Sequence, residues 1–275
     1  MSDKAIKMDY DEYDEEEVRD IYMAPFEDCT KLEKIIIGKN IRYLNSDFPG
    51  CKSLKEVEVD AENEYYVSVN GSILNRDQNK LYYYISADED GTYRIPKNVK
   101  YVYDGALRGG LGKIKHIVLP DKMRNFEVIT YDIEEITLGK KYYNNGDLSW
   151  LRPFKKVNIS DENPYYSMES DMVCDKNKTK LLICFGTKKV CKMPNTVTSV
   201  DENAFESYSS LEELYVSDSV TDMTGWFKNG IVKNALYCPT AHCERYKPHF
   251  DFGDIPSPIV PHRNKLQTQG GMTAH

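Results

Sequence analysis

The sequence lacks any run of apolar residues long enough to cross a bilayer, which takes about 20 residues. Its first residues also lack the basic segment and the apolar segment of a secretory signal peptide. We therefore expect no membrane insertion and, for the chain as it stands, a cytoplasmic location. Tryptophan and phenylalanine are scarce, with 2 and 9 residues. The 21 tyrosines, in contrast, supply rings with a polar tip, which suit half-buried and contact positions.

An excess of basic residues is absent too. The formal net charge is −8, and residues 1–20 account for most of it, because nine acidic and three basic side chains give −6 and leave −2 for the rest of the chain. Binding to nucleic acid depends on a basic surface, so nucleic acid is not an expected partner. Residues 1–17 are predicted to form a flexible acidic leader.

Motifs for catalysis or metal binding are missing as well. Cys238, His242 and Cys243 match no standard zinc spacing, and the acidic run at 86–91 lacks the glutamate that closes an EF-hand loop, because Lys97 stands in its place. There is no phosphate-binding glycine loop, and no cysteine has an obvious base partner in the sequence. We predict no catalytic residue, no cofactor and no metal site. Seven cysteines are an odd number, and we expect them to act as reduced, buried side chains.

What the sequence does contain is a repeated apolar pattern. The pattern begins at Phe26, returns 22 positions later at Phe48 and returns again at Phe205. Its last two apolar positions have the period of a β-strand, and apolar residues four and three positions further on predict a segment that returns over the core. The predicted strands end at 37, 59, 95, 119, 138, 159, 193 and 216, so most repeats span 19–24 residues. Such a period is typical of a leucine-rich repeat solenoid.

Two longer repeats contain the same insertion. Residues 63–81 and 163–181 both begin with Asn-x-Tyr-Tyr and continue with two β-rich runs around a polar turn, which predicts a hairpin. The match continues, offset by 98, between 95–107 and 193–205. The chain is thus predicted to contain a duplicated block of about a hundred residues, a regularity expected of a repeat array. The predicted fold class is an α/β-type leucine-rich repeat solenoid, rich in β-structure, with a parallel sheet of short strands, hairpin inserts and few short helices.

The chain is predicted to have three segments. The leader at 1–17 precedes a solenoid at 18–250, whose open end is closed by a cap at 235–248 that contains a short helix at 241–247. From 251 to 275 the composition shifts to Pro, Gly, Gln and Thr, and we expect a disordered tail.

The repeats resemble those of the BspA-like (Treponema pallidum-type) leucine-rich repeat family, Ala-Phe-x-x-Cys-x-x-Leu-x-x-Ile-x-Ile-Pro followed by Val-x-x-Ile. The resemblance covers about residues 18–250. It implies a bacterial protein of the cell surface, or a secreted one, that acts in adhesion. The residues that carry it are Phe26, Cys29, Leu32, Ile35 and Ile37; Phe48, Cys51, Leu54, Val57 and Val59; Ala204, Phe205, Tyr208, Leu211, Leu214 and Val216; and, directly after strands, Pro96, Pro120 and Pro194.

Two surfaces are candidates for partner binding. In a solenoid the residue between the two buried positions of each strand projects from the exposed face of the sheet, beside its equivalents in neighbouring repeats. The second candidate is the tyrosine run of the first hairpin, because alternate side chains of a strand are exposed and exposed tyrosines often anchor interfaces. The predicted sheet row is Ile36, Glu58, Arg94, Val118, Thr137, Asn158, Lys192 and Tyr215, and the hairpin run is Tyr82, Tyr83 and Tyr84.

These features leave three functions open. The first is a monomeric, non-enzymatic module that binds a protein or a glycan through a pre-formed surface. The second is an intracellular structural or scaffolding repeat protein, favoured by the missing leader and the free thiols. The third is a hydrolase, although no clustered nucleophile, base and acid can be assembled from the sequence.

Overall fold

The structure is a computed structural model of the chain. It divides into two compact units, Met1–Asn144 and Asn145–His275. The predicted cap helix at 241–247 lies outside the described residues. The structure describes residues 5–8, 26, 28–44, 48, 51–84, 87, 89–103, 106–107, 114–123, 126, 133–144, 148–185, 188–206, 211–221, 235–239 and 259–262.

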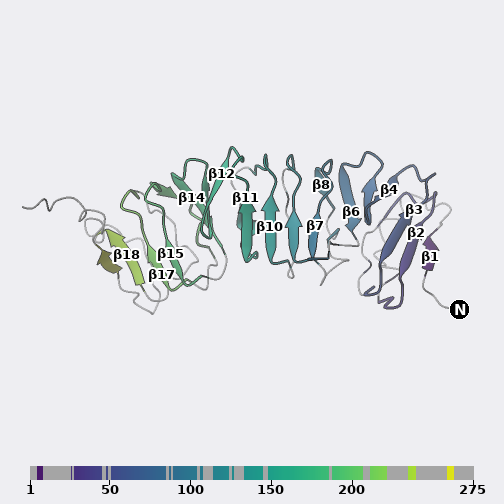
Figure 1. Cartoon of the computed structure of the whole chain (residues 1–275), viewed down its shortest axis with the longest axis horizontal. Helices are drawn as coiled ribbons and strands as arrows, with labels where there is room; N and C mark the ends of the chain where they lie inside the picture. Colours follow the sequence, from purple (N-terminus) through teal and green to yellow (C-terminus); the bar gives the residue numbers. More distant parts are fainter. Residues whose placement is uncertain are drawn as a thin grey trace, which may run out of the picture. The chain divides into compact units, whose positions relative to one another are not determined.

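The first unit begins with a parallel sheet of three strands in the order β1-β2-β3 (Figure 1). Ile35 and Ile37 of β2 point into the core and are fully buried. Four residues of the predicted leader belong to this sheet: they pair with β2 because the edge of a sheet offers unpaired backbone groups. The strands are β1 (Ala5–Met8), β2 (Lys34–Ile37) and β3 (Glu56–Val59).

The inserted segment of the first unit is an antiparallel meander of three strands. Its first turn has positive φ angles at Asn70 (47°) and Gly71 (73°), the backbone that a two-residue Asn-Gly hairpin loop requires. The predicted hairpin, around the polar turn between Leu74 and Leu81, is confirmed by the antiparallel pairing of β5 with β6, and β4 is one strand more than expected. The strands are β4 (Tyr66–Val69), β5 (Ser72–Asn75) and β6 (Lys80–Tyr84), and β8 (Tyr101–Val102) pairs with β6 in parallel.

The remaining strands of the first unit form a second parallel array. Tyr93, Ile117 and Ile136 stand in register and face the core, each 5 % exposed or less. The strands are β7 (Thr92–Arg94), β9 (His116–Val118) and β10 (Glu135–Leu138).

The second unit repeats this plan. It contains an antiparallel meander, β12-β13-β14, and a parallel sheet, β15-β17-β18-β19. Strand β19 lies in the predicted tail, and its four residues pair in parallel with β18. The strands are β11 (Lys156–Ile159), β12 (Tyr166–Glu169), β13 (Met172–Asp175), β14 (Lys180–Cys184), β15 (Val190–Lys192), β16 (Ser199–Val200), β17 (Glu213–Tyr215), β18 (Ala235–Pro239) and β19 (Ile259–His262).

The duplicated block is reproduced down to single hydrogen bonds. We call residues 63–107 the first copy and 163–205 the second copy. The Tyr103 N–H donates to the Leu81 carbonyl at 2.8 Å, and the Asp201 N–H donates to the Leu181 carbonyl at 2.8 Å. Positions in the two copies can therefore be compared one by one.

The repeated pattern Asn-x-Tyr-Tyr forms the same hydrogen bonds in the first copy and in the second. Asn63 and Asn163 are both fully buried. The side-chain oxygen of each accepts the backbone N–H groups of the two following tyrosines, at 2.8 and 2.8 Å for the first and 2.8 and 2.9 Å for the second. An asparagine that bonds to the backbone two and three residues on begins a turn, and here the turn leads into the meander.

The architecture is a β-solenoid of stacked parallel strands, as the repeat period predicted, but the α/β label is not confirmed in the described residues. Their one helical element is a 3-10 helix at Ser149–Leu151, η2. The return segments close with four-residue turns instead, such as those in which the Val99 N–H donates to the Pro96 carbonyl at 2.9 Å and the Val197 N–H donates to the Pro194 carbonyl at 3.1 Å. The proline that follows a strand has no backbone N–H, and one turn is too short for a helix to nucleate.

Candidate functional site

The predicted sheet row exists within each parallel array. Ile36 stands beside Glu58, and Arg94 stands beside Val118, which stands beside Thr137. In the second unit Lys192 stands beside Tyr215. Asn158 is half-buried on β11. Alternation places these side chains opposite the buried ones, because successive residues of a strand point to opposite faces.

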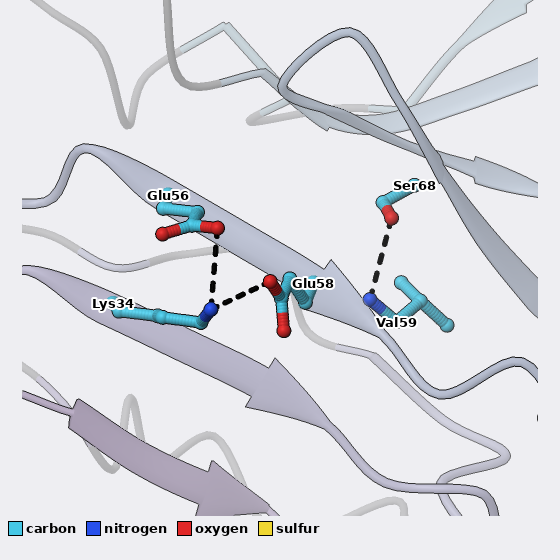
Figure 2. Close-up of polar contacts among 5 residues, drawn as sticks. All are labelled: Lys34, Glu56, Glu58, Val59 and Ser68. Carbon is cyan, nitrogen blue, oxygen red and sulfur yellow. Dashed lines mark hydrogen bonds and ion pairs between the residues drawn. The ribbon is translucent and has the colours of Figure 1, made fainter.

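At the first sheet the outward face is an ion-pair network (Figure 2). The Lys34 ammonium donates to Glu58 Oε1 at 2.6 Å and to Glu56 Oε1 at 3.2 Å. These contacts raise the pKa of Lys34, chiefly through the Glu58 hydrogen bond, and the Lys34 hydrogen bond lowers the pKa of Glu58. The Glu58 carboxylate, a member of the predicted row, is therefore ion-paired with the Lys34 ammonium of the neighbouring strand. The Val59 N–H donates to the Ser68 hydroxyl at 3.4 Å, which connects the end of β3 to β4 (Figure 2).

His116 occupies the outward face of the second array, and sequence reasoning missed it because the predicted row took Val118 from the same strand. Its Nε2 lies 2.8 Å from the Thr137 hydroxyl and 3.9 Å from a Glu135 oxygen, and its Nδ1 lies 3.4 Å from the Thr92 hydroxyl. A hydrolytic triad needs the acid at the imidazole nitrogen opposite the nucleophile. Here the carboxylate and the closer hydroxyl share one nitrogen, so the arrangement is that of a hydrogen-bonded ladder across the sheet.

In the second unit the row continues into an aromatic stack. The rings of Tyr215 and Tyr237 lie parallel, 4.1 Å apart with an interplanar angle of 6°, and the Lys192 ammonium lies 5.0 Å from the Tyr215 ring centre. Burial, the Tyr237 hydroxyl and the Glu213 carboxylate raise the pKa of Tyr215 to about 12. The sheet row predicted from the sequence ended at Tyr215. It omitted Tyr237, which lies in the next strand, the one predicted to be the last of the solenoid.

The structure buries two of the three tyrosines that the sequence offered as a candidate hairpin contact. Tyr83 and Tyr84 are 1 % and 0 % exposed, and only Tyr82 reaches the surface. The pairing of β5 with β6 is irregular between Ile73 and Leu74, so two consecutive side chains of β6 turn inward where simple alternation buries one. The two buried rings pack against aromatic neighbours, Phe48 at 4.8 Å and Tyr93 at 4.6 Å.

The remaining tyrosine belongs to a cluster at the surface of the first copy. The Tyr82 ring stacks on the Tyr103 ring at 5.4 Å and meets the Tyr66 ring edge-on at 5.1 Å. The Lys80 ammonium lies 5.0 and 5.3 Å from the Tyr82 and Tyr103 ring centres, within the range of a cation–π contact. Tyr101, which pairs in register with Lys80, is 63 % exposed. We call Lys80, Tyr82, Tyr101 and Tyr103 the tyrosine patch.

The second copy lacks this patch although its backbone is the same. Leu182, Ser199 and Asp201 stand where the first copy has its three tyrosines. The lysine is retained as Lys180, and its ammonium forms an ion pair with the Asp201 carboxylate at 2.9 Å. The fold therefore does not require the aromatic side chains of the patch.

The cysteines are mostly packing residues, with one exception. Among the described cysteines, Cys29, Cys51, Cys174, Cys184 and Cys191 are free thiols. Cys238 is disulfide-bonded, which corrects the prediction of reduced cysteines at that position. Burial raises the pKa of Cys174 to about 12, so this thiol is a poor nucleophile. The described residues contain no group of three or more His, Cys, Asp or Glu side chains placed to hold a metal ion. In the part of the chain that the structure describes, no helix has the length and apolar character to span a membrane.

Stacked parallel strands, buried apolar positions at a fixed period and short return turns define a leucine-rich repeat solenoid. A family model described as the BspA type leucine rich repeat region matches six copies in the chain, at residues 12–71 and 184–235, so the repeats of these two segments are similar to leucine-rich repeats of the BspA type. The resemblance found in the sequence is thereby confirmed.

Two solved structures are similar to this chain. A leucine-rich repeat protein from Eubacterium ventriosum ATCC 27560 is 14 % identical, with a TM-score of 0.40, over 87 % of this chain and 62 % of that one. The pneumococcal vaccine antigen PcpA is 17 % identical, with a TM-score of 0.36, over 84 % of this chain and 56 % of that one. The chain thus spans less than two thirds of the length of either structure. No curated protein matches the chain.

Proposed function

We propose that the chain is a non-enzymatic interaction module and that the tyrosine patch contacts its protein or glycan partner. The observation that carries this proposal is the difference between the two copies. Both copies hold the same backbone hydrogen bonds, but only the first places Tyr82, Tyr101 and Tyr103 around a lysine. Side chains that the fold does not need, and that are partly exposed, are available for recognition, and tyrosine is a frequent anchor of interfaces.

The charge of the patch favours a partner that carries carboxylates. In the second copy the equivalent lysine, Lys180, holds a carboxylate of its own chain. In the first copy a tyrosine replaces that aspartate, and within the described residues Lys80 has two ring faces and no carboxylate as neighbours. A carboxylate of the partner would gain a charge-assisted hydrogen bond there, next to rings that supply apolar contact.

The outward sheet rows are the second proposed contact surface. Arg94, Val118 and Thr137 form one stretch in the first unit, and Lys192 and Tyr215 form one in the second. Cross-strand register fixes the backbone positions of these residues, so little backbone entropy is lost when a partner binds. The remaining members of the proposed row are Ile36, Glu58 and Asn158.

The test exchanges the patch for the residues of the second copy. The double variant Tyr82→Leu, Tyr103→Asp carries side chains that the same backbone already accommodates at 182 and 201, and Tyr143→Leu removes an exposed tyrosine outside the patch as a control. Binding of the full chain is measured on an array of neutral and carboxylated glycans and in pull-downs with extracellular proteins. We expect the double variant to lose at least about tenfold in affinity, which is about 1.4 kcal/mol, and the control to bind normally.

Two results would contradict the proposal. Equal affinity of the double variant and the unsubstituted chain would remove the patch from the interface. Affinities no better than about millimolar for every glycan and protein would count against an interaction module as such.

A structural or scaffolding role inside the cell is the second candidate, and the five free thiols favour it, since cytosolic proteins keep their cysteines reduced. The disulfide at Cys238 favours an extracellular location instead, which is also what the family resemblance implies. Cell fractionation separates the two candidates. Recovery of the protein from the cytosol alone would support the scaffold and rule out action at the cell surface.

A further inference from the structure

Two buried thiols of the second unit lie in contact. Cys184 ends β14 and Cys191 is the central residue of β15, and they are 1 % and 6 % exposed. Their sulfur atoms are 3.6 Å apart, and the Cys191 sulfur also lies 3.5 Å from the Met172 sulfur. A disulfide bond requires about 2 Å between the sulfurs, so the two side chains need only a small rotation to reach it.

The fold itself brings these two positions together, because the first copy shows the same juxtaposition with different side chains. Tyr84 and Tyr93 occupy the equivalent positions, and their rings pack 4.6 Å apart. The two copies also share a backbone hydrogen bond beside the pair. The Cys184 N–H donates to the Ala204 carbonyl at 2.8 Å, and the Tyr84 N–H donates to the equivalent carbonyl of Ala106 at 3.3 Å. The proximity of the thiols is therefore set by the backbone of the repeat and not by one choice of rotamer.

We propose that Cys184 and Cys191 are a cross-linking site, at which a small-molecule disulfide such as oxidised glutathione converts the two thiols into an intramolecular disulfide. Cys191, the more exposed of the two, attacks a sulfur of the oxidant as a thiolate, forms a mixed disulfide and releases one reduced thiol. The thiolate of Cys184 then attacks the Cys191 sulfur and releases the second. The two cysteines lose two electrons and two protons, which the two thiols of the reduced oxidant carry away.

Such a bond would join the meander to the parallel sheet of the second unit, since β14 belongs to the one and β15 to the other. The hydrogen bond with Cys191 and burial hold the pKa of the Cys184 thiol well above its usual range. Oxidation of the folded chain is therefore expected to be slow, and faster when the chain folds in the presence of the oxidant, before the thiols are covered.

A tryptic digest under non-reducing conditions reads the bond directly. Trypsin cuts after Lys188 and Lys189, between the two cysteines, so the peptides 181–188 and 190–192 separate unless a disulfide joins them. The full chain is denatured, refolded with either oxidised glutathione or a reducing agent, and mapped by mass spectrometry. We expect the joined peptide after oxidation and two separate thiol peptides after reduction.

Thermal unfolding supplies the independent readout. The oxidised chain should melt a few degrees above the reduced chain, because the cross-link restricts the unfolded state. Cys191→Ala should remove the part of this difference in melting temperature that the Cys184–Cys191 bond causes, while Cys238 stays in place. Cys51→Ala removes a buried free thiol of the other unit and should leave the difference in melting temperature unchanged. Free thiols at both positions after oxidation, a glutathione on each, or a bond from either to a different cysteine would overturn the proposal.

Discussion

Asn63 holds two repeats together, and its removal is expected to be costly. The side chain is 0 % exposed; its amide donates to the carbonyls of Gly38 (2.8 Å) and Ile41 (3.0 Å), and its oxygen accepts the N–H groups of Tyr65 and Tyr66 (both 2.8 Å). A buried hydrogen bond contributes about 1 kcal/mol, and backbone groups left without a partner cost more. Asn63→Ala removes four such bonds, so the free energy of unfolding should fall by about 4 kcal/mol.

Urea unfolding followed by far-ultraviolet circular dichroism measures this change, and the melting temperature should fall by roughly 10 °C. Asn98→Ala, at an exposed turn of the same unit, is the matched control and should stay within about 0.5 kcal/mol. Asn63→Asp keeps both acceptor contacts but replaces the donor by an oxygen that faces two carbonyls, so it should also destabilise the chain. If Asn63→Ala unfolds like the Asn98 control, the asparagine does not hold the repeats, and the explanation of the Asn-x-Tyr-Tyr pattern fails.

Two further predictions concern close packing and pH. A Cβ atom on Gly139 would overlap the Pro120 carbonyl group, so Gly139→Ala should lower the free energy of unfolding in urea by about 3 kcal/mol. Lys141→Ala, on the exposed turn, is the control and should be neutral, and equal stabilities of the two variants would refute this close approach. Burial raises the pKa values of Tyr66, Tyr84 and Tyr93, so the folded state keeps phenol protons that the unfolded state releases near pH 10. Stability from these groups is therefore fully present below about pH 10 and is lost above it, which melting temperatures against pH will show. Phenolate absorbance at pH 10 from all tyrosines of the folded chain would contradict this.

Much of the fold follows from the apolar period. The predicted strand ends at 37, 59, 138 and 159 coincide with the observed ones, and those at 95, 119, 193 and 216 lie one residue beyond Arg94, Val118, Lys192 and Tyr215. The agreement arises because each strand must bury two side chains one residue apart, a requirement that is written locally. Strands β1 and β19 were not predicted, because an edge strand is recruited by the unpaired backbone of its neighbour and not by a pattern of its own.

The candidate surfaces were predictable only in part. The rows Arg94-Val118-Thr137 and Lys192-Tyr215 followed from register. The inward turn of both Tyr83 and Tyr84 did not, because it depends on an irregular pairing with the next strand, which no alternation rule describes.

The sequence by itself determined the repeat, the duplicated block and the asparagines that begin each meander, because every copy must satisfy the same burial and turn geometry. Only the tertiary structure decided which side chains from different strands meet. Equivalent lysines lie over two tyrosine rings in one copy and beside Asp201 in the other. Equivalent inward positions hold a tyrosine pair in one copy and the Cys184–Cys191 thiol pair in the other. Such contacts join residues that are distant in the sequence, so their chemistry emerges only when the backbone brings them together.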